Sequence, residues 1–169
     1  MFRTGLYLLQ TVVTTDVALK QMEGIRVAYV PHRGPYSEIG FAFQRLLRLL
    51  SSRRLRPAGP MIALYFEEPG EGAIMKARSE AAVPVIGEVK PDNELRVRDH
   101  PPSEVASLIH DGPPSRYEES YATLQKWIKA HGYEIAGPTR EIYSRDLSEL
   151  PPGILYAEIQ IPVRKKRKR

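Results

Sequence analysis

The sequence contains no cysteine, which excludes disulfide bonds and thiolate metal ligands and favours a reducing cytoplasm. Histidine is also scarce, with four residues and no spaced cluster of the kind that binds zinc. No apolar run approaches the roughly 18 residues of a membrane span, and polar residues dilute the N-terminus too much for a signal peptide. Phosphate-binding loops and dinucleotide fingerprints are absent as well. We therefore expect a cytoplasmic protein with no membrane span, no metal and no cofactor.

Charge is unevenly distributed along the chain. The formal net charge is +5, but the last six residues, Arg164–Arg169, are all basic, so the remainder carries a net charge of −1. Such a run of like charges repels itself and predicts a solvated, disordered tail. Its alternative role is a weak, salt-dependent contact with nucleic acid or an anionic surface. The body of the protein is close to neutral, and its 169 residues suit one compact domain.

An internal repeat organises the chain. Shifting the sequence by 78 positions aligns residues 16–85 with residues 94–163 without a gap and with 14 identities. The identities cluster at turns and strand ends, which predicts two copies of one unit joined by a linker at residues 86–93. The predicted domain organisation is an N-terminal extension (1–15), a single domain of two repeats (16–163) and a basic tail (164–169).

Each copy shows the same order of predicted elements: two strands, a Gly-Pro break, a helix, a second Gly-Pro turn and two further strands. The helices start at Ser37 and Ser115, and Ser115 with Glu118 has capping-box spacing. Apolar residues recur at helical spacing in both helices. In the first helix they are Ile39, Phe43, Leu46, Leu47 and Leu50, and in the second Tyr117, Tyr121, Leu124 and Ile128. This order predicts an α+β fold of two pseudo-symmetric strand-helix-strand-strand modules with antiparallel sheets.

Strand alternation assigns side chains to the two faces of the sheet. In the last strand Ala157, Ile159 and Ile161 form an apolar face that we expect to pack on a helix. In strand 139–143 we expect Ile142 to face the helix, which leaves Glu141 and Tyr143 on the helix-free side. Two half-sheets that meet at these helix-free faces enclose a ligand cleft, opposite the helices. Through the repeat, the predicted cleft residues are Tyr65, Glu80, Glu141, Tyr143, Tyr156 and Glu158.

One position in this set breaks the repeat. Glu80 and Glu158 are equivalent, as are Tyr65 and Tyr143, but the equivalent of Glu141 is Ala63. A residue that departs from the symmetry of a shared scaffold is a candidate for function. A carboxylate beside phenol rings suits a cationic organic ligand; the alternative interpretation is a solvated sheet face.

Three segments resemble the GyrI-like effector-binding domain family, which includes the ligand domains of multidrug-responsive transcription regulators. The segments are Val27–Tyr36 (VAYVPHRGPY), Gly137–Tyr143 (GPTREIY) and Glu158–Val163 (EIQIPV). The resemblance implies a central cleft with an acidic residue that recognises cationic, aromatic drugs, and Glu141 matches that position. Residues 1–15 are too short for the helix-turn-helix region of the regulators, so we expect a stand-alone effector-binding protein.

The resemblance leaves two alternatives to sensing or sequestering a small molecule. Some stand-alone relatives hydrolyse cyclopropane-bearing alkylating agents. In that case Glu141 or Glu158 would activate water and a tyrosine such as Tyr143 would polarise the leaving oxygen. Another relative inhibits gyrase, which implies a gyrase- or DNA-associated role with the basic tail as the docking element.

Overall fold

The computed structural model describes residues 16–67, 76–145 and 147–167, without the side chain of Leu147. The predicted extension at residues 1–15 and the end of the tail lie outside this range. The strands are β1 (Ala18–Met22), β2 (Ile25–Arg33), β3 (Met61–Tyr65), β4 (Arg78–Pro84), β5 (Arg96–His100), β6 (Ser103–Gly112), β7 (Tyr133–Ile135), β8 (Thr139–Tyr143) and β9 (Leu155–Lys165). The helices are α1 (Ile39–Ser52) and α2 (Tyr117–Ala130), preceded by 3₁₀ turns at Tyr36–Glu38 and Pro114–Arg116, and a third 3₁₀ turn covers Leu147–Glu149.

All strand pairs are antiparallel and belong to one sheet of order β1-β6-β9-β8-β3-β4-β2-β5, with β7 added to the end of β9. The order is symmetric about its centre, because each strand has its repeat-equivalent strand at the same distance on the other side of the β8–β3 pair. A shift of 78 residues converts the bounds of β1, α1 and β3 into those of β5, α2 and β8. The α+β fold with antiparallel strands and two helices is therefore confirmed, and its spacing is consistent with a tandem duplication.

The pairing of β3 with β8 places the centre of this pseudo-symmetry. Ala63 lies opposite Glu141, and these two residues are also equivalent positions of the repeat. On the other face of the sheet the equivalent residues Gly24 and Pro102 meet, because a Cβ on Gly24 would lie 3.3 Å from the Pro102 ring. The pseudo-twofold axis therefore passes between Ala63 and Glu141, so that Glu141 lies at the centre of the sheet.

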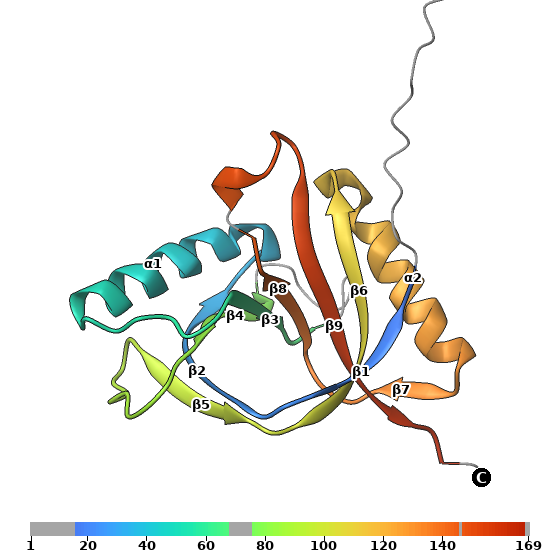
Figure 1. Cartoon of the computed structure of the whole chain (residues 1–169), viewed down its shortest axis with the longest axis horizontal. Coiled ribbons are helices and arrows are strands. Elements are labelled where there is room, and N and C mark those ends of the chain that lie inside the picture. Colours follow the sequence, from blue (N-terminus) through green and yellow to red (C-terminus); the bar gives the residue numbers. More distant parts are fainter. Residues whose placement is uncertain (1–15, 68–75, 146, 168–169) are drawn as a thin grey trace, which may run out of the picture.

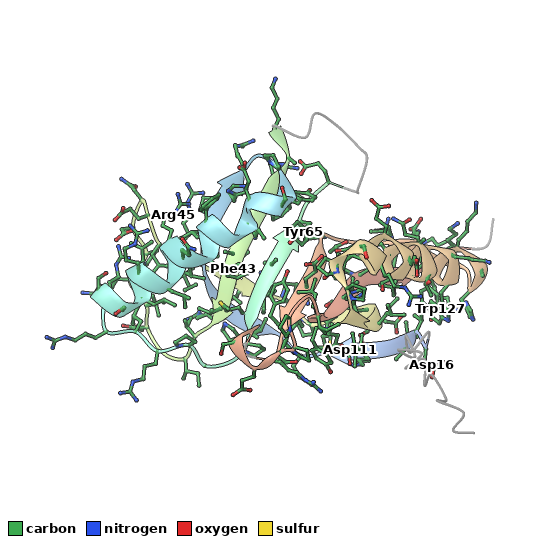
Figure 2. The ribbon with its side chains drawn as sticks, turned by 90° about the horizontal axis from the view of Figure 1, so that it is seen from above. Asp16, Phe43, Arg45, Tyr65, Asp111 and Trp127 are labelled. Carbon is green, nitrogen blue, oxygen red and sulfur yellow. The ribbon has the colours of Figure 1, made fainter. Side chains whose placement is uncertain are left out.

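The two helices cover one face of the sheet, at its two ends (Figure 1). Helix α1 packs on β2 and β4, and α2 packs on β6 and β9. Leu46 and Leu124 are equivalent residues at the centres of these two cores, and both are fully buried. Each helix contributes an apolar stripe at the predicted spacing, except that Leu47 of α1 is 43% exposed and lies outside the core. Burial of these stripes against β-branched and aliphatic residues stabilises the fold. Seen from above, Tyr65 on β3 lies between the two helices (Figure 2).

The predicted faces of the central strands are wrong. Ile142 pairs with Glu158 and Glu141 pairs with Ile159, so Glu141 shares the face of Ile159, which packs under α2. Apolar side chains of β3 and β8 point to the other face, where Ile62, Leu64 and Ile142 form a third cluster with Val27 and Tyr29. The central strands lie between the helices rather than beneath one of them, and the crossing connections β1–β2 and β5–β6 cover their apolar side.

Three smaller predictions also need correction. The helices begin at Ile39 and Tyr117, after 3₁₀ turns, and no side-chain capping bond forms at either start, so the Ser115–Glu118 capping box is absent. Strand β7 was not predicted. The basic tail does not begin at Arg164, because Arg164 and Lys165 continue β9. Arg164 forms an ion pair with Glu134 of β7, and the Lys165 ammonium lies 4.4 Å from the ring centre of Tyr133.

Candidate functional site

A cavity of about 850 Å³ lies on the helix-bearing face of the sheet, between the first 3₁₀ turn and α2. Its floor is formed by β3 and β8, so it lies on the same side as the helices and not, as predicted, on the opposite side. Its volume falls in the range of about 300–1,000 Å³ that is usual for small-molecule sites. Its described lining contains no Lys, Arg or His and includes four tyrosines and three glutamates: Tyr36, Tyr65, Tyr117, Tyr121, Glu67, Glu118 and Glu141.

Glu141 lies at the bottom of this cavity and is 5% exposed. The Tyr121 hydroxyl of α2 donates a hydrogen bond to Oε1 of Glu141 at 2.5 Å. The Tyr143 hydroxyl donates to Oε2 at 2.5 Å, and the Tyr65 hydroxyl of β3 approaches the same oxygen at 3.3 Å. Strand β8 places Tyr143 two residues from Glu141 and therefore on the same face. Three elements thus hold one carboxylate in a fixed orientation.

The charge of Glu141 has no partner of opposite sign in the described part of the chain, where no ion pair includes it. Burial raises the pKa of Tyr65, Tyr121 and Tyr143, and the negative charge of Glu141 raises each pKa further. The phenols therefore remain neutral donors across the physiological pH range. They satisfy the hydrogen bonds of the carboxylate but leave its negative charge uncompensated.

The pseudo-twofold axis relates the space between Tyr65 and α2 to the space between Tyr143 and α1, and only the first of these is an open cavity. Phe43 on α1 is the repeat equivalent of Tyr121, and its ring packs edge-on against Tyr143 with 5.8 Å between ring centres. Tyr143 is therefore covered by α1 and orients Glu141 without lining the cavity. On the other side Tyr65 lines the cavity, and the Tyr36 ring lies 4.5 Å from it between ring centres.

Tyr36 and Glu67 form one wall of the cavity. The Tyr36 hydroxyl contacts the Glu67 carboxylate at 3.1 Å, and the same carboxylate accepts a hydrogen bond from the Arg78 guanidinium at 2.7 Å. Burial raises the pKa of Tyr36. The negative charge of Glu67 is therefore balanced by Arg78, unlike that of Glu141.

Three of the predicted site residues lie on the other face of the sheet. Glu80 forms a two-bonded ion pair with Arg98 of β5, and the equivalent Glu158 pairs with Lys20 of β1 at 2.8 Å. Lys20 and Arg98 are themselves separated by 78 residues, so the repeat preserves both partners. These carboxylates are already neutralised within the sheet and are separated from the cavity by its full thickness.

Glu158 is further held by its neighbours. Burial acts to raise its pKa, but hydrogen bonds from Lys20, Ser107 and Gln160 outweigh burial and lower it. Tyr156 also lies on this face, where the Arg145 guanidinium stacks 4.1 Å from its ring centre. Of the six predicted residues, the structure therefore brings together Tyr65, Glu141 and Tyr143 and excludes the other three.

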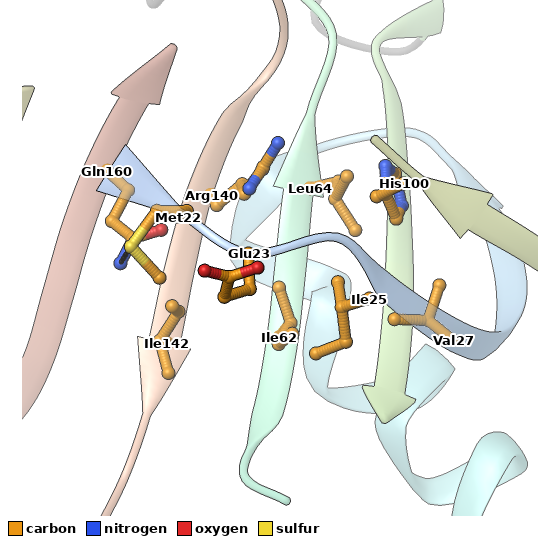
Figure 3. Close-up of a pocket in the computed structure, with 10 residues that line it drawn as sticks. All are labelled: Met22, Glu23, Ile25, Val27, Ile62, Leu64, His100, Arg140, Ile142 and Gln160. Carbon is orange, nitrogen blue, oxygen red and sulfur yellow. Dashed lines mark hydrogen bonds between the residues drawn. The ribbon is translucent and has the colours of Figure 1, made fainter. Parts of the chain in front are cut away.

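A second cavity, of about 60 Å³, lies under the central strands on the helix-free face (Figure 3). Its lining is mostly aliphatic, from Ile25, Ile62, Leu64 and Ile142, with Arg140 and His100 at one side. The Arg140 guanidinium donates to the Ser103 hydroxyl at 3.2 Å. Burial lowers the pKa of His100, and the neighbouring charge of Arg140 lowers it further. A space of this volume holds only a few water molecules, so it does not compete with the larger cavity as a ligand site.

Several cavity residues are not among the predicted site residues. Tyr117 and Tyr121 follow the apolar spacing of α2, which predicts a core position, and Glu118 has the spacing of a helix cap. Tyr36 and Glu67 carry no predicted site role. The available signal was the exchange of Ile39 and Phe43 in α1 for tyrosines at the equivalent positions of α2. A hydroxyl within an otherwise apolar stripe has to find a polar partner, which here is Glu141.

The described residues contain no group of three His, Asp or Glu side chains suited to a metal ion. His110 contacts the Ser120 hydroxyl at 2.9 Å and the Gly112 carbonyl at 3.2 Å. No helix in the described part of the chain is long and apolar enough to cross a membrane.

The family model for the GyrI-like small molecule binding domain matches residues 15–164. The chain belongs to the GyrI-like small molecule binding domain family. The resemblance read from the sequence motifs is thus confirmed. The large cavity exceeds in volume a pocket of about 360 Å³ beside α1, whose lining includes the basic residues Arg33 and Arg45. No match was found among curated proteins.

Solved structures share the fold at low sequence identity. The C-terminal domain of EcmrR superposes with a TM-score of 0.78 at 21% identity, with 89% of this chain and 98% of that domain covered. In the EcmrR–DNA complex the same comparison covers 89% of this chain but only 58% of the EcmrR chain (TM-score 0.79, 20% identity).

Two further solved structures with this fold carry different functional descriptions, one a bound ligand and the other an enzyme class. SAV2435, solved with bound tetraphenylphosphonium, has a TM-score of 0.58 and 14% identity over 88% of this chain and 94% of its own. A Listeria innocua protein named a hydrolase has a TM-score of 0.68 and 12% identity over 91% of this chain and 94% of its own. At these identities the comparisons establish the common fold.

Proposed function

We propose that this protein binds lipophilic organic cations in the cavity between the first 3₁₀ turn and α2, and so senses or sequesters them. The observation that carries this proposal is the environment of Glu141. Its carboxylate is buried and hydrogen-bonded by phenols, yet no cation among the described residues balances its charge. A ligand cation supplies the missing charge, and removal of both charges from water is then offset by their attraction.

The aromatic walls suit the apolar part of such a ligand. Tyr36, Tyr65 and Tyr117 line the cavity and present ring surface to it. Contacts of a cation with tyrosine rings are worth about 0.5–2 kcal/mol each. Ring stacking depends weakly on the substitution pattern of the ligand, so we expect broad specificity among flat or multi-ring cations. That a relative has been solved with tetraphenylphosphonium agrees with this class of ligand.

The hydrolase alternative has less support from the geometry. Both oxygens of Glu141 already accept hydrogen bonds from tyrosine hydroxyls, so a water molecule would have to displace a phenol before the carboxylate took its proton. Glu158, the other candidate base, lies on the opposite face and is paired with Lys20. A Listeria innocua protein of this fold is named a hydrolase, but both candidate bases of this chain, Glu141 and Glu158, are already engaged with other side chains.

The docking alternative depends on the basic tail, whose first two residues belong to strand β9. Arg164 and Lys165 are engaged with β7, so the charges left for a gyrase or DNA contact start at Lys166. We regard a weak salt-dependent contact through the remaining tail as secondary to ligand binding. Its test is a comparison of DNA binding by the full chain and a variant that ends at Lys165.

The test of ligand binding is a fluorescence titration with rhodamine 6G. We expect Glu141→Gln to weaken binding by roughly 10- to 100-fold, because a hydrogen bond or contact to a charged group contributes about 1.5–3 kcal/mol. The matched control is Glu158→Gln, which removes a carboxylate of the same size from the opposite face and leaves rhodamine affinity unchanged. Equal affinity of the wild type and Glu141→Gln would remove Glu141 as the recognition group.

A further inference from the structure

The cavity carries more negative charge than a single ligand cation neutralises. Three carboxylates line it, from Glu67, Glu118 and Glu141. Glu67 is balanced by Arg78. Neither Glu118 nor Glu141 has an ion pair among the described residues, and Glu118 accepts no hydrogen bond from them either. Because the described lining holds no basic side chain, two negative charges remain uncompensated.

Glu118 lies at the rim of the cavity, on the same face of α2 as Tyr121. The two residues are three positions apart, which places them one above the other on the helix surface. Because no capping box forms, the Glu118 carboxylate makes no hydrogen bond to the backbone at the start of α2. Tyr121 reaches Glu141 through its hydroxyl, whereas Glu118, about one helical turn or roughly 5 Å along the helix, is exposed to solvent. The Glu118 and Glu141 carboxylates are therefore separated by a distance on the order of 10 Å.

The repeat shows that this charge belongs to one side of the fold only. The equivalent of Glu118 in α1 is Gly40, and the equivalent of the neighbouring residue Glu119 is Phe41. Glu119 does not line the cavity and forms an ion pair with Arg116 at 3.1 Å. The open side of the fold thus differs from the closed side by a rim carboxylate as well as by the tyrosines.

We infer that Glu118 is a specificity residue that gives the cavity a preference for organic dications over monocations of the same length. This inference rests on the proposed function. One cationic centre contacts Glu141 and the tyrosines, while the second lies at the rim and is attracted by Glu118. The ligand class is a pair of quaternary or protonated amines joined by an apolar spacer that keeps them on the order of 10 Å apart.

The experiment compares two ligands that share an eight-carbon chain with one trimethylammonium group and differ in a second such group, 1,8-bis(trimethylammonium)octane and octyltrimethylammonium, by calorimetry at low ionic strength. Since Glu118 is exposed, its contribution is that of a surface ion pair, and we expect the wild type to prefer the dication by about three- to fivefold. Glu118→Gln should abolish the preference, and Glu119→Gln, the matched control on the same helix turn, should retain it. Added salt should reduce the preference of the wild type, because a rim charge is screened.

The outcomes separate this inference from the proposed function. If the wild type and Glu118→Gln show the same ratio of dication to monocation affinity, Glu118 has no such role, while Glu141-dependent binding of the monocation still supports the proposed function. If neither ligand nor rhodamine 6G binds the wild type, both proposals fail together. Loss of the preference in Glu118→Gln alone, with Glu119→Gln unchanged, is the result that supports the inference.

Discussion

Replacement of Ala63 by glutamate is expected to destabilise the protein strongly at neutral and alkaline pH. Ala63 is fully buried and lies directly opposite Glu141 across the pseudo-twofold axis. Residues in such cross-strand pairs have Cβ atoms roughly 4.5–5.5 Å apart. A carboxylate at position 63 therefore faces a second buried carboxylate in the middle of the sheet.

The magnitude follows from Coulomb's law. Two negative charges about 5 Å apart repel by about 3 kcal/mol at an effective dielectric constant of about 20. The pair reduces this repulsion by holding a proton, which raises the pKa of the carboxyl pair above the ordinary value of about 4.3. With a raised folded-state pKa, the penalty is absent below the unfolded pKa and grows as the pH rises through the folded pKa.

The assay is urea unfolding between pH 4 and pH 8 for Ala63→Glu and for Ala63→Gln, which adds the same volume without the charge. We expect the Glu variant to lose about 3 kcal/mol relative to the Gln variant at pH 8 and to approach it near pH 4. The double variant Ala63→Glu with Glu141→Gln should recover this difference. Equal stability of the two single variants at pH 8 would refute the register that places Glu141 on the axis.

Two further substitutions test the surroundings of the carboxylates on the two faces. Tyr121→Phe should lower the free energy of unfolding at pH 7 by about 1.5–3 kcal/mol, because it removes a donor to a buried charge. Tyr117→Phe, one turn away, removes a hydroxyl that lies near Glu141 but forms no hydrogen bond with it, and should cost less. A loss of equal size in both variants would contradict the assigned donors. Glu158→Gln should lower stability by about 1 kcal/mol at pH 7. Because the pKa of Glu158 is lowered in the folded state, its contribution to stability exists above the unfolded pKa and is lost as the pH falls. Denaturation curves of the wild type and the variant should therefore converge at acidic pH, near about pH 3. A difference in stability that does not change with pH would be inconsistent with the ion pair to Lys20.

The repeat and the order of elements could be predicted from the sequence because both are encoded locally. Gly-Pro pairs mark turns, and they recur at a fixed spacing. At Gly59 the reason is close packing, since a Cβ there would lie 2.9 Å from the Pro84 ring. The apolar stripes of α1 and α2 likewise follow from residues three and four positions apart.

The face of Glu141 could not be predicted in the same way. Alternation along β8 shows that Glu141 and Ile142 point in opposite directions, but it does not show which direction leads to a helix. The prediction assumed that an apolar residue faces the helix, which holds for Ile159 on β9 but fails for Ile142. The apolar cover of Ile142 comes from the crossing connections, and this is a long-range feature that strand alternation does not encode.

The most direct test of the central claim is a crystal structure of the protein with tetraphenylphosphonium, a cation with no hydrogen-bond donor. We predict the phosphonium on the helix-bearing face, among Tyr36, Tyr65 and Tyr117 and with Glu141 as the nearest carboxylate. Its position on the opposite face, beside Glu80 or Glu158, would contradict the account.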